Sequence, residues 1–352
     1  MKQLFFCLAA FIFSATVFSQ NEIDRIVDEG VKLYDEGKYE EALKKYDSAL
    51  ILNKNHYLAN YEKSYTLLTI KKYDECIKIS KFLLELDPKN INTKGVYVNL
   101  GSAQDDKGDE EEALKAFTKG IEHFPDYHLL YFNRGITYFK LEKDNESIID
   151  FQNALKCEPL HPGSHQFLGK LTADNNRIPA IMSFFTFLLI EPEGSRAVAN
   201  YELLDKLIMK GITESQDAKG KTVIGIEALM PDKKNKPVDN DFSSLDVFLS
   251  LSSALDKGDK FKDQNIAEKL DRKLSDMVSI IQERKQSGTG FFWEFYVPFF
   301  KDLKDKKQLL TACYIATLQA KNEPVEKWLK ENNSKVQEFY KWLDEYKWNV
   351  KR

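Results

Sequence analysis

Apolar side chains recur every three or four positions along residues 23–192, and charged side chains fill many of the positions between them. This spacing gathers apolar side chains on one face of a helix, so it predicts a series of amphipathic helices. Prolines close successive helix pairs, because proline lacks the N–H that a helix needs and disfavours helix in the residue before it. These prolines are Pro88, Pro125, Pro159 and Pro192. This stretch is therefore predicted to consist of helical hairpins.

Small residues and prolines repeat along the same stretch with a nearly fixed period. Ala42 and Cys76 are 34 residues apart, and Pro125 and Pro159 are also 34 apart. Glycines are predicted where the two helices of a hairpin press together, because a side chain there would push the helices apart. These glycines are Gly30, Gly101, Gly135 and Gly169. One hairpin cannot cover its own apolar face, so the hairpins are expected to stack as a solenoid.

The pattern resembles the tetratricopeptide repeat, whose period is about 34 residues. The third hairpin carries the resemblance in Gly101, Gly108, Ala113, Phe117 and Pro125. It extends over five repeats in residues 23–194 and implies an all-α fold, a right-handed solenoid of helical hairpins whose first helices line a concave face. Residues 195–210 resemble the helix that often closes such an array. The resemblance also implies that the concave face binds a peptide or protein partner.

The second half of the chain has a different pattern. Residues 211–242 are predicted to form a junction with a short strand at 221–226, where Val and Ile cluster, and a turn-rich loop after it. The alternative is a long insertion within one continuous helical stack. Residues 243–352 are predicted to form a smaller α-helical domain without the repeat landmarks. Ser244 is the predicted N-cap of its first helix, and a longer helix is predicted over residues 265–286.

An aromatic-rich segment at residues 291–303 stands out within this second domain. Pro298 is expected to force a kink or a restart of the helix there. The favoured interpretation of residues 291–300 is a core segment, because aromatic side chains dominate burial. The alternative is an exposed patch that docks a partner. Further helices are predicted at residues 309–320, 324–330 and 334–346.

The first 19 residues have the pattern of a secretory signal peptide. Lys2 precedes an apolar run at residues 4–18, and Val17 and Ser19 precede a plausible cleavage site before Gln20. The alternative is an uncleaved membrane anchor, but the run is short for a span, which needs about 20 apolar residues. Cys7 lies too early for a lipoprotein signal. The protein is therefore expected to be periplasmic or secreted.

Charge and cysteine content narrow the class of protein further. The chain has 51 basic and 55 acidic residues, a net charge of −4, which becomes −5 when Lys2 is removed with the signal peptide. This mildly acidic balance does not favour a nucleic-acid partner, and no second apolar run predicts a membrane span. Cys76, Cys157 and Cys313 are too few and too widely spaced for a disulfide framework. Cys76 is predicted to be a buried free thiol at a packing position.

Motifs that would indicate catalysis are weak. Gly220-Lys221-Thr222 resembles the end of a phosphate-binding loop, but Ser215 stands where that loop needs a glycine. The sequence contains no G-x-S-x-G motif and no histidine after His165, which removes the commonest general base from the second domain. We therefore expect no enzyme activity and no required cofactor.

Three potential metal ligands, Cys157, His161 and His165, are spaced by four residues. Pro159 and Pro162 interrupt any shared helical face, and no fourth ligand is near in the sequence. The favoured interpretation of these residues is structural.

Candidate partner-binding residues lie on the first helices. Asn99 and Asn133 occupy the same position in repeats three and four, and asparagine can both donate to and accept from a peptide backbone. The segment around Asn133 resembles the family's carboxylate clamp, but Asp28 and Glu62 stand where repeats one and two would need asparagine or lysine. The alternative for Asn99 and Asn133 is that they are solvated polar residues on the groove wall.

Aromatic side chains on the same helices are predicted to add apolar contacts. Tyr61, Tyr65 and Phe132 are the candidates, with packing between repeats as the alternative for Tyr65. The sequence therefore favours an exported scaffold or adaptor that binds a protein or peptide. The alternatives are a hydrolase-like enzyme with its site in or next to the C-terminal domain, and a purely structural spacer.

Overall fold

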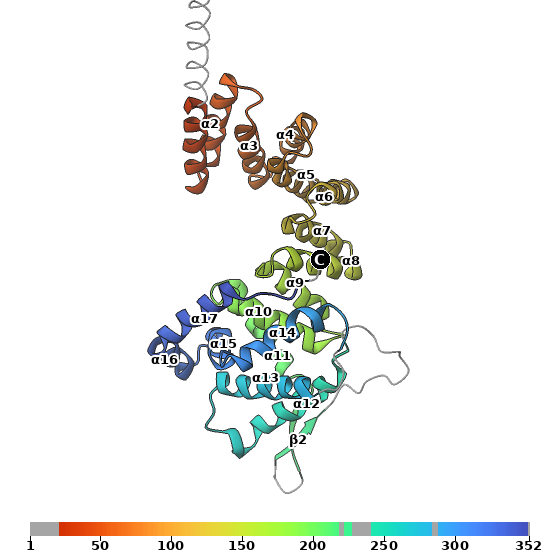
Figure 1. The fold of residues 1–352 in the computed structure, drawn as a ribbon, viewed down its shortest axis with the longest axis vertical. Coiled ribbons are helices and arrows are strands. Elements are labelled where there is room, and N and C mark those ends of the chain that lie inside the picture. The colour runs from red at the N-terminus through yellow and green to blue at the C-terminus, as the bar shows by residue number, and fades with distance from the viewer. Residues whose placement is uncertain (1–20, 218–221, 227–240, 284–287, 351–352) are drawn as a thin grey trace, which may run out of the picture. The chain divides into compact units, whose positions relative to one another are not determined.

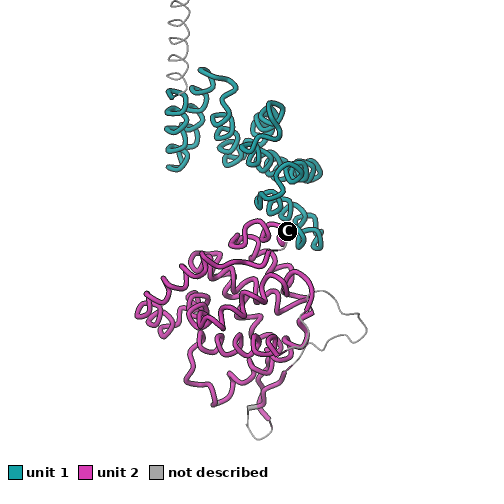
Figure 2. Tube along the Cα trace, viewed as in Figure 1, with its two compact units in different colours: residues 1–150 teal, residues 151–352 magenta. Residues whose placement is uncertain are grey.

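The computed structural model describes residues 21–217, 222–226, 241–283 and 288–350 (Figure 1). Within these residues the chain is helical apart from one two-stranded sheet and short connections. The chain divides into two compact units, residues 1–150 and 151–352 (Figure 2). The prediction of an all-α fold is confirmed. The predicted signal peptide and most of the predicted turn-rich loop lie outside the described residues.

The first unit is built from helices that pack against their neighbours in the chain. We call the leading helix of each hairpin its first helix and the following one its second helix. The first helices are residues 21–35, α3 (Tyr57–Thr69), α5 (Lys94–Lys107, preceded by the short η1, Ile91–Thr93) and α7 (His128–Lys140). The second helices are α2 (Tyr39–Leu52), α4 (Tyr73–Leu86), α6 (Glu110–His123) and α8 (Asp144–Cys157), which continues past the boundary of the unit.

Glycine allows the helices of a hairpin to touch, as the sequence predicts. A Cβ atom built on Gly30 would lie 2.5 Å from the ring of Tyr46, and one built on Gly101 would lie 2.5 Å from the ring of Phe117. Real Cβ contacts are never so short, because packed interiors leave no room for overlap. Each aromatic ring belongs to the second helix of the same hairpin. The prediction that these glycines mark the contact between paired helices is confirmed.

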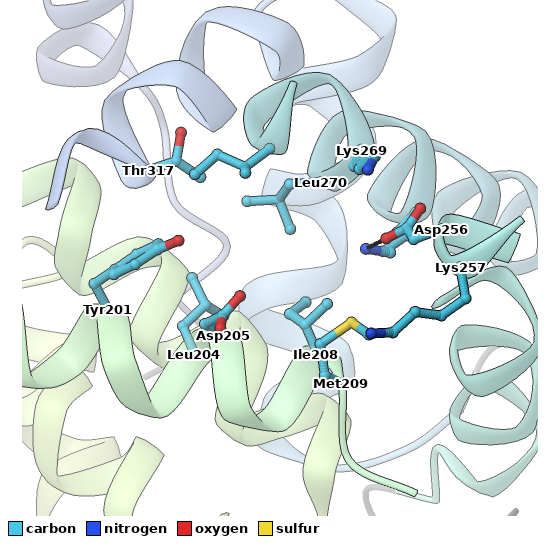
Figure 3. Close-up of a pocket in the computed structure, with 12 residues that line it drawn as sticks. Tyr201, Leu204, Asp205, Ile208, Met209, Asp256, Lys257, Lys269, Leu270 and Thr317 are labelled. Carbon is cyan, nitrogen blue, oxygen red and sulfur yellow. Dashed lines mark ion pairs between the residues drawn. The ribbon is translucent and has the colours of Figure 1, made fainter. Parts of the chain in front are cut away.

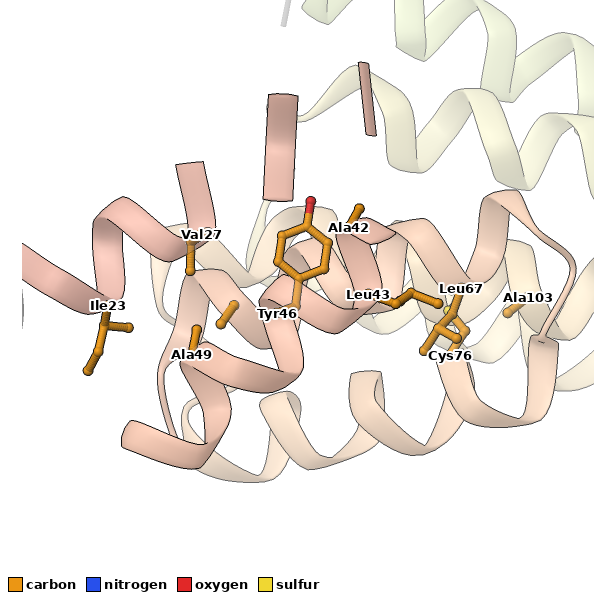
Figure 4. Packing of buried hydrophobic residues seen from close by; sticks show 10 residues of the cluster. Ile23, Val27, Ala42, Leu43, Tyr46, Ala49, Leu67, Cys76 and Ala103 are labelled. Carbon is orange, nitrogen blue, oxygen red and sulfur yellow. The ribbon is translucent and has the colours of Figure 1, made fainter. Parts of the chain in front are cut away.

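Small side chains complete this contact from the second helix. Ala42 and Cys76 occupy equivalent positions in α2 and α4, and both are fully buried. Figure 4 shows Ala42 beside Tyr46 and Leu43 in the core of the first hairpins. Cys76 is a free thiol, as predicted, and burial raises its pKa to about 11.

The second unit is also mainly helical. Its elements are α9 (Pro162–Thr172), α10 (Arg177–Ile190), α11 (Ser195–Ile208), β1 (Ile212–Gln216), β2 (Thr222–Ile226), α12 (Ser243–Ala254), η2 (Leu255–Lys257), η3 (Asp259–Phe261), α13 (Ile266–Glu283), α14 (Phe291–Asp305), α15 (Leu309–Ala316), η4 (Leu318–Ala320), α16 (Glu323–Glu331) and α17 (Asn333–Glu345).

Helix α10 lies at the centre of this unit. Its residues 177–189 are all buried, which agrees with a sequence that is apolar on every face. Helices α9, α11, α12 and α15 pack against it. Gly169 of α9 approaches α10 as the repeat pattern predicts, because a Cβ built there would lie 2.7 Å from the ring of Phe184. The helices that the sequence assigns to the fifth repeat therefore belong to the core of the second unit.

The aromatic segment forms α14 and belongs to the core. Seven of its residues 291–300 are buried, with Tyr296, Phe299 and Phe300 fully so. The ring of Phe299 stacks on Trp348 at a centroid distance of 4.5 Å, and that of Phe300 lies 5.3 Å from Phe185 of α10. The interpretation of this segment as core is confirmed. The helix continues through Pro298, so of the two predicted effects the restart is excluded, while the kink stays a prediction.

The junction contains a hairpin of two antiparallel strands. β2 confirms the predicted strand, and it pairs with β1 in a register that places Ile212 opposite Ile226. The sequence does not predict β1, because ITESQ is mostly polar and lacks the cluster of β-branched apolar residues that marks β2. The hairpin therefore depends on the pairing between the two strands.

Two helix starts in the second unit test the capping predictions. Helix α12 begins at Ser243, one residue before the predicted cap, and Asp241 Oδ1 accepts from the Ser243 N–H at 2.9 Å. The prediction that Ser244 caps this helix is therefore wrong. At α13, Asn265 Oδ1 accepts from the N–H of Glu268, whose carboxylate accepts in return from the Asn265 N–H. This reciprocal pair holds the predicted start of the long helix; its predicted end at residue 286 lies outside the described residues.

Candidate functional site

Two tyrosines on α3 line the surface of the first helices. The phenol of Tyr61 rests on α5 at Gly95, where a Cβ atom would lie 2.7 Å from Tyr61 Oη. Its ring stacks near that of Tyr57 at a centroid distance of 6.4 Å, and burial raises its pKa to about 12. Tyr65, one turn further along, is 41% exposed, and its ring lies 5.4 Å from Tyr34. Tyr61 is thus partly anchored, whereas Tyr65 exposes part of its ring beside Tyr34.

A carboxylate shares this stretch of α3. Glu62 is half-buried, and its pKa is raised first by burial and then by the neighbouring charge of Asp35. The Glu62 charge also contributes to the raised pKa values of Tyr61 and Tyr65. The tyrosine surface therefore has negative charge within it.

The two candidate asparagines have different surroundings. Asn99 is only 2% exposed, and its Nδ2 donates to Ser64 Oγ of α3 at 3.0 Å. Asn133 is half-buried; its Nδ2 donates to Leu129 O at 2.7 Å, and its Oδ1 accepts from Ser102 Oγ of α5 at 3.5 Å. Each amide therefore links its own first helix to the preceding one. The structure does not bring the two side chains together as an exposed pair, and binding of a partner by either stays a prediction.

The α7 segment that carries Phe132 and Asn133 is anchored by its arginine. Arg134 Nε and Nη2 donate to the two carboxylate oxygens of Asp150 at 2.7 and 2.8 Å, and Nη1 donates to Thr118 Oγ1 at 2.9 Å. Phe132 is half-buried on the same helix. Arg134 therefore fixes α7 against the second helices on either side of it, with all three guanidinium nitrogens taking part.

A pocket of about 240 Å³ lies within the second unit, and the sequence does not predict it (Figure 3). It forms among α11, η2 and α13, with Thr317 closing one side. Figure 3 shows Tyr201, Leu204, Asp205 and Ile208 of α11 opposite Lys269 and Leu270 of α13. Its lining residues are Tyr201, Leu204, Asp205, Ile208, Met209, Asp256, Lys257, Ile266, Lys269, Leu270, Lys273 and Thr317.

A buried charge network forms the wall of this pocket beside η2. Asp256 forms ion pairs with Arg272 through one carboxylate oxygen and with Lys273 through the other. Arg272 is further held by Ser252, whose hydroxyl accepts from Nη1 at 2.7 Å, and it covers the ring of Phe261 at 4.2 Å. The Lys273 side chain is 5% exposed, and burial lowers its pKa against the opposing effect of Asp256.

The two histidines near Pro159 have structural roles. His161 Nδ1 accepts from the Ser164 N–H at 3.2 Å and so caps α9. His165 is fully buried; its Nε2 lies 2.8 Å from Pro159 O and its Nδ1 lies 2.7 Å from Tyr296 Oη. Because a carbonyl can only accept, Nε2 carries the proton and Nδ1 accepts from the Tyr296 hydroxyl. Among the described residues no group of three His, Cys, Asp or Glu side chains is arranged to hold a metal ion.

The signals for these features in the sequence are unequal. Arg272 and Lys273 belong to an amphipathic helix whose sequence does not indicate a binding site, and only the fold brings them to Asp256 and to α11.

In the described part of the chain, no helix combines the length and the apolar character needed to cross a membrane.

Comparison with known proteins identifies one of the repeats. Residues 95–127, which span α5, α6 and the turn after them, match the family model described as tetratricopeptide repeat. A search of curated proteins found no match.

Several solved structures are similar over about half of this chain. A thermophilic tetratricopeptide-repeat protein of Thermus thermophilus is 23% identical, with 52% of this chain and 98% of that one covered and a TM-score of 0.45. PilF of Pseudomonas aeruginosa is 15% identical, with coverages of 55% and 91% and a TM-score of 0.47. MamA of Desulfovibrio magneticus is 19% identical, with coverages of 49% and 97% and a TM-score of 0.41. The chain therefore contains a tetratricopeptide repeat at α5 and α6, within its stack of helical hairpins.

Proposed function

We propose that this protein is an exported interaction scaffold whose first helices bind a protein or peptide partner. The observation that carries this proposal is the tyrosine surface of α3, where Tyr61 is anchored on Gly95 and Tyr65 is exposed. Tyrosine is enriched at protein interfaces because it offers a large, rigid apolar area and a polar tip at a small entropic cost. An anchored ring beside an exposed one gives a partner a preorganised place to pack.

Charge limits the kind of partner that this surface accepts. Burial first, and then the neighbouring charge of Asp35, raise the pKa of Glu62, so a negative charge at this position is already costly. A carboxylate placed beside them would be repelled, whereas a lysine or arginine would relieve the repulsion and could also lie over a tyrosine ring. The proposed partner therefore presents a basic side chain next to an apolar one, and the C-terminal carboxylate that a clamp would bind is disfavoured here.

The test compares two faces of the same unit. The chain without residues 1–19 is immobilised, partners are captured from the cell envelope, and the capture is repeated with Tyr65→Ala and with Tyr61→Ala/Tyr65→Ala. The matched control is Ile51→Ala/Leu52→Ala on the second helix α2, where Ile51 is 84% exposed. A partner that is lost from both tyrosine variants and kept by the control supports the proposal, provided that circular dichroism shows each variant folded.

Two results would contradict the scaffold. Equal capture by the tyrosine variants and the wild type would exclude this surface, and the absence of any captured partner would favour a structural spacer. An Asn99→Ala/Asn133→Ala variant tests the remaining candidate residues. Because Asn99 is buried and bonded to Ser64, its loss is expected to lower stability as well as any binding.

Export is the second part of the proposal, and the pattern of residues 1–19 supports it. The protein recovered from its own cells should begin at Gln20, as an intact-mass measurement would reveal. A chain that retains Met1 would contradict cleavage and would favour the alternative, an uncleaved membrane anchor.

A further inference from the structure

We propose that the pocket among α11, η2 and α13 binds a small carboxylic acid with an apolar body, a function separate from the scaffold surface. The site lies wholly within the second unit, and its residues come from segments between Tyr201 and Thr317.

Buried polar groups facing the pocket indicate a ligand. Lys273 is 5% exposed, yet its ammonium has three N–H donors. Among the described residues, Asp256 is its partner, and that carboxylate is shared with Arg272. Donors left without a partner in a buried position are costly, so a lysine in this setting is stabilised when an acceptor enters the pocket. Burial lowers the Lys273 pKa, and a bound carboxylate would oppose this effect by favouring the charged form.

The balance of charge around the pocket specifies a monoanion. Four cations belong to the pocket and its wall: Lys257, Lys269, Lys273 and Arg272. Three carboxylates oppose them, namely Asp205 and Asp256 in the lining and Glu214, which lies 3.3 Å from Lys257. Four positive charges against three leave an excess of one. A single negative charge on the ligand would balance the site, whereas a cation would be repelled.

The rest of the lining specifies an apolar body of limited size. Five apolar side chains line the pocket beside Tyr201 and Thr317; these are Leu204, Ile208, Met209, Ile266 and Leu270. Ligand sites combine apolar walls with a few placed polar groups, and they commonly measure about 300–1,000 Å³. This pocket, at about 240 Å³, is slightly smaller. It therefore fits an acid with a short aliphatic chain better than a nucleotide or a larger cofactor.

The test uses hexanoate as the probe and hexanol as its neutral counterpart. Isothermal titration with the chain lacking residues 1–19 should show saturable binding of hexanoate and at least about tenfold weaker binding of hexanol, the factor that one lost charge interaction typically costs. Equal affinities for the two compounds, or no binding of hexanoate up to about 10 mM, would overturn the proposal.

Lysine variants then locate the site. Lys273→Met should abolish hexanoate binding, but it also breaks a buried ion pair and could unfold the unit. Lys269→Met is the safer variant, because Lys269 lines the pocket without an ion pair among the described residues. It should weaken hexanoate binding about tenfold, whereas Lys330→Met, on exposed α16, should leave it unchanged. Unchanged binding in a folded Lys269→Met variant would overturn the assignment of the pocket.

Discussion

Arg177 and Asp246 form a buried ion pair in which Nη1 lies 3.1 Å from Oδ1, although 69 residues separate them in the chain. The same guanidinium donates to the last-turn carbonyls of Leu207 and Ile208 at 2.6 and 2.9 Å. It also donates to Ser250 Oγ. Arg177 thus ties α10 to the end of α11 and to α12. These bonds satisfy carbonyl groups that a helix end otherwise leaves unpaired.

Replacing Arg177 with methionine should strongly destabilise the second unit. The substitution keeps an apolar chain of similar length but removes the buried ion-pair partner of Asp246 and one donor from each of two carbonyls, for an expected loss of about 3–5 kcal/mol. The measurement is urea unfolding monitored by tryptophan fluorescence. Arg196→Met is the control, because Arg196 pairs with Glu191 at an exposed position and should cost below about 1 kcal/mol. Similar losses in the two variants would show that the buried network is not what holds these helices.

Stability should fall in mild acid because of His165. Burial lowers the pKa of its ring from 6.5 to about 3 in the folded chain. Between these values the unfolded chain binds a proton that the folded chain does not, so stability is full above pH 6.5 and decreases as the pH falls. The expected slope is about 1.4 kcal/mol per pH unit.

Unfolding measured at several pH values between 7 and 5 would reveal this slope. A His165→Gln variant should be less stable at pH 7, since it loses a partner of Tyr296, and should show a flatter pH dependence. His123→Gln, on α6 of the first unit, should keep the wild-type slope. A slope that survives in His165→Gln would assign the acid sensitivity to another group.

Replacement of glycine by alanine should lower stability at Gly169, where the helices are in close contact, and should have little effect at Gly258. In Gly169→Ala the new Cβ would meet the ring of Phe184, which is fully buried and cannot move away. The strain, about 1–3 kcal/mol, should exceed the gain of about 1 kcal/mol in helix propensity. Gly258→Ala, where the nearest atom is Leu255 O at 3.7 Å, should be close to neutral. Thermal unfolding of both variants is the measurement, and equal melting temperatures would contradict the close contact.

The cysteines should differ in reactivity. Burial raises the pKa of Cys76 to about 11 and that of Cys313 well above its ordinary value, so both remain protonated at pH 8. Only the thiolate reacts. Cys157 is partly exposed and should be alkylated first in the folded protein, with the other two modified after unfolding. Peptide mass spectrometry after timed iodoacetamide treatment would give the order, and early modification of Cys76 would mean that its hairpin opens readily.

Local contacts explain which features the sequence predicts well. Gly101 and Phe117 are 16 residues apart, and the repeat pattern predicts their contact within one hairpin. The core position of α14 follows from its aromatic content. β1 could not be predicted, because its polar residues become a strand only by pairing with β2. A cap shifted by two residues, from Ser244 to Phe242, lies within the usual uncertainty of helix ends.

The candidate sites were harder to predict because they depend on contacts that are distant in the chain. Asn99 and Asn133 occupy equivalent repeat positions, yet Ser64 binds one in the interior while the other stays half-buried. Asp205 and Lys273 belong to different helices and meet only around the pocket. The pattern of apolar and polar residues within α11 or α13 does not predict that Asp205 and Lys273 line the same pocket.

The enclosure of α10 has a consequence for the order in which the chain reaches its native state. Hairpins of the first unit complete their main contacts with residues made shortly before or after them. Helix α10 must instead wait for α15, which is synthesised more than a hundred residues later. Until Leu309–Ala316 has emerged from the ribosome, the part of the apolar α10 surface that α15 covers is open to premature association. Nascent chains of this protein thus face a vulnerable interval that lies late in translation, between the completion of the repeats and the arrival of the last helices.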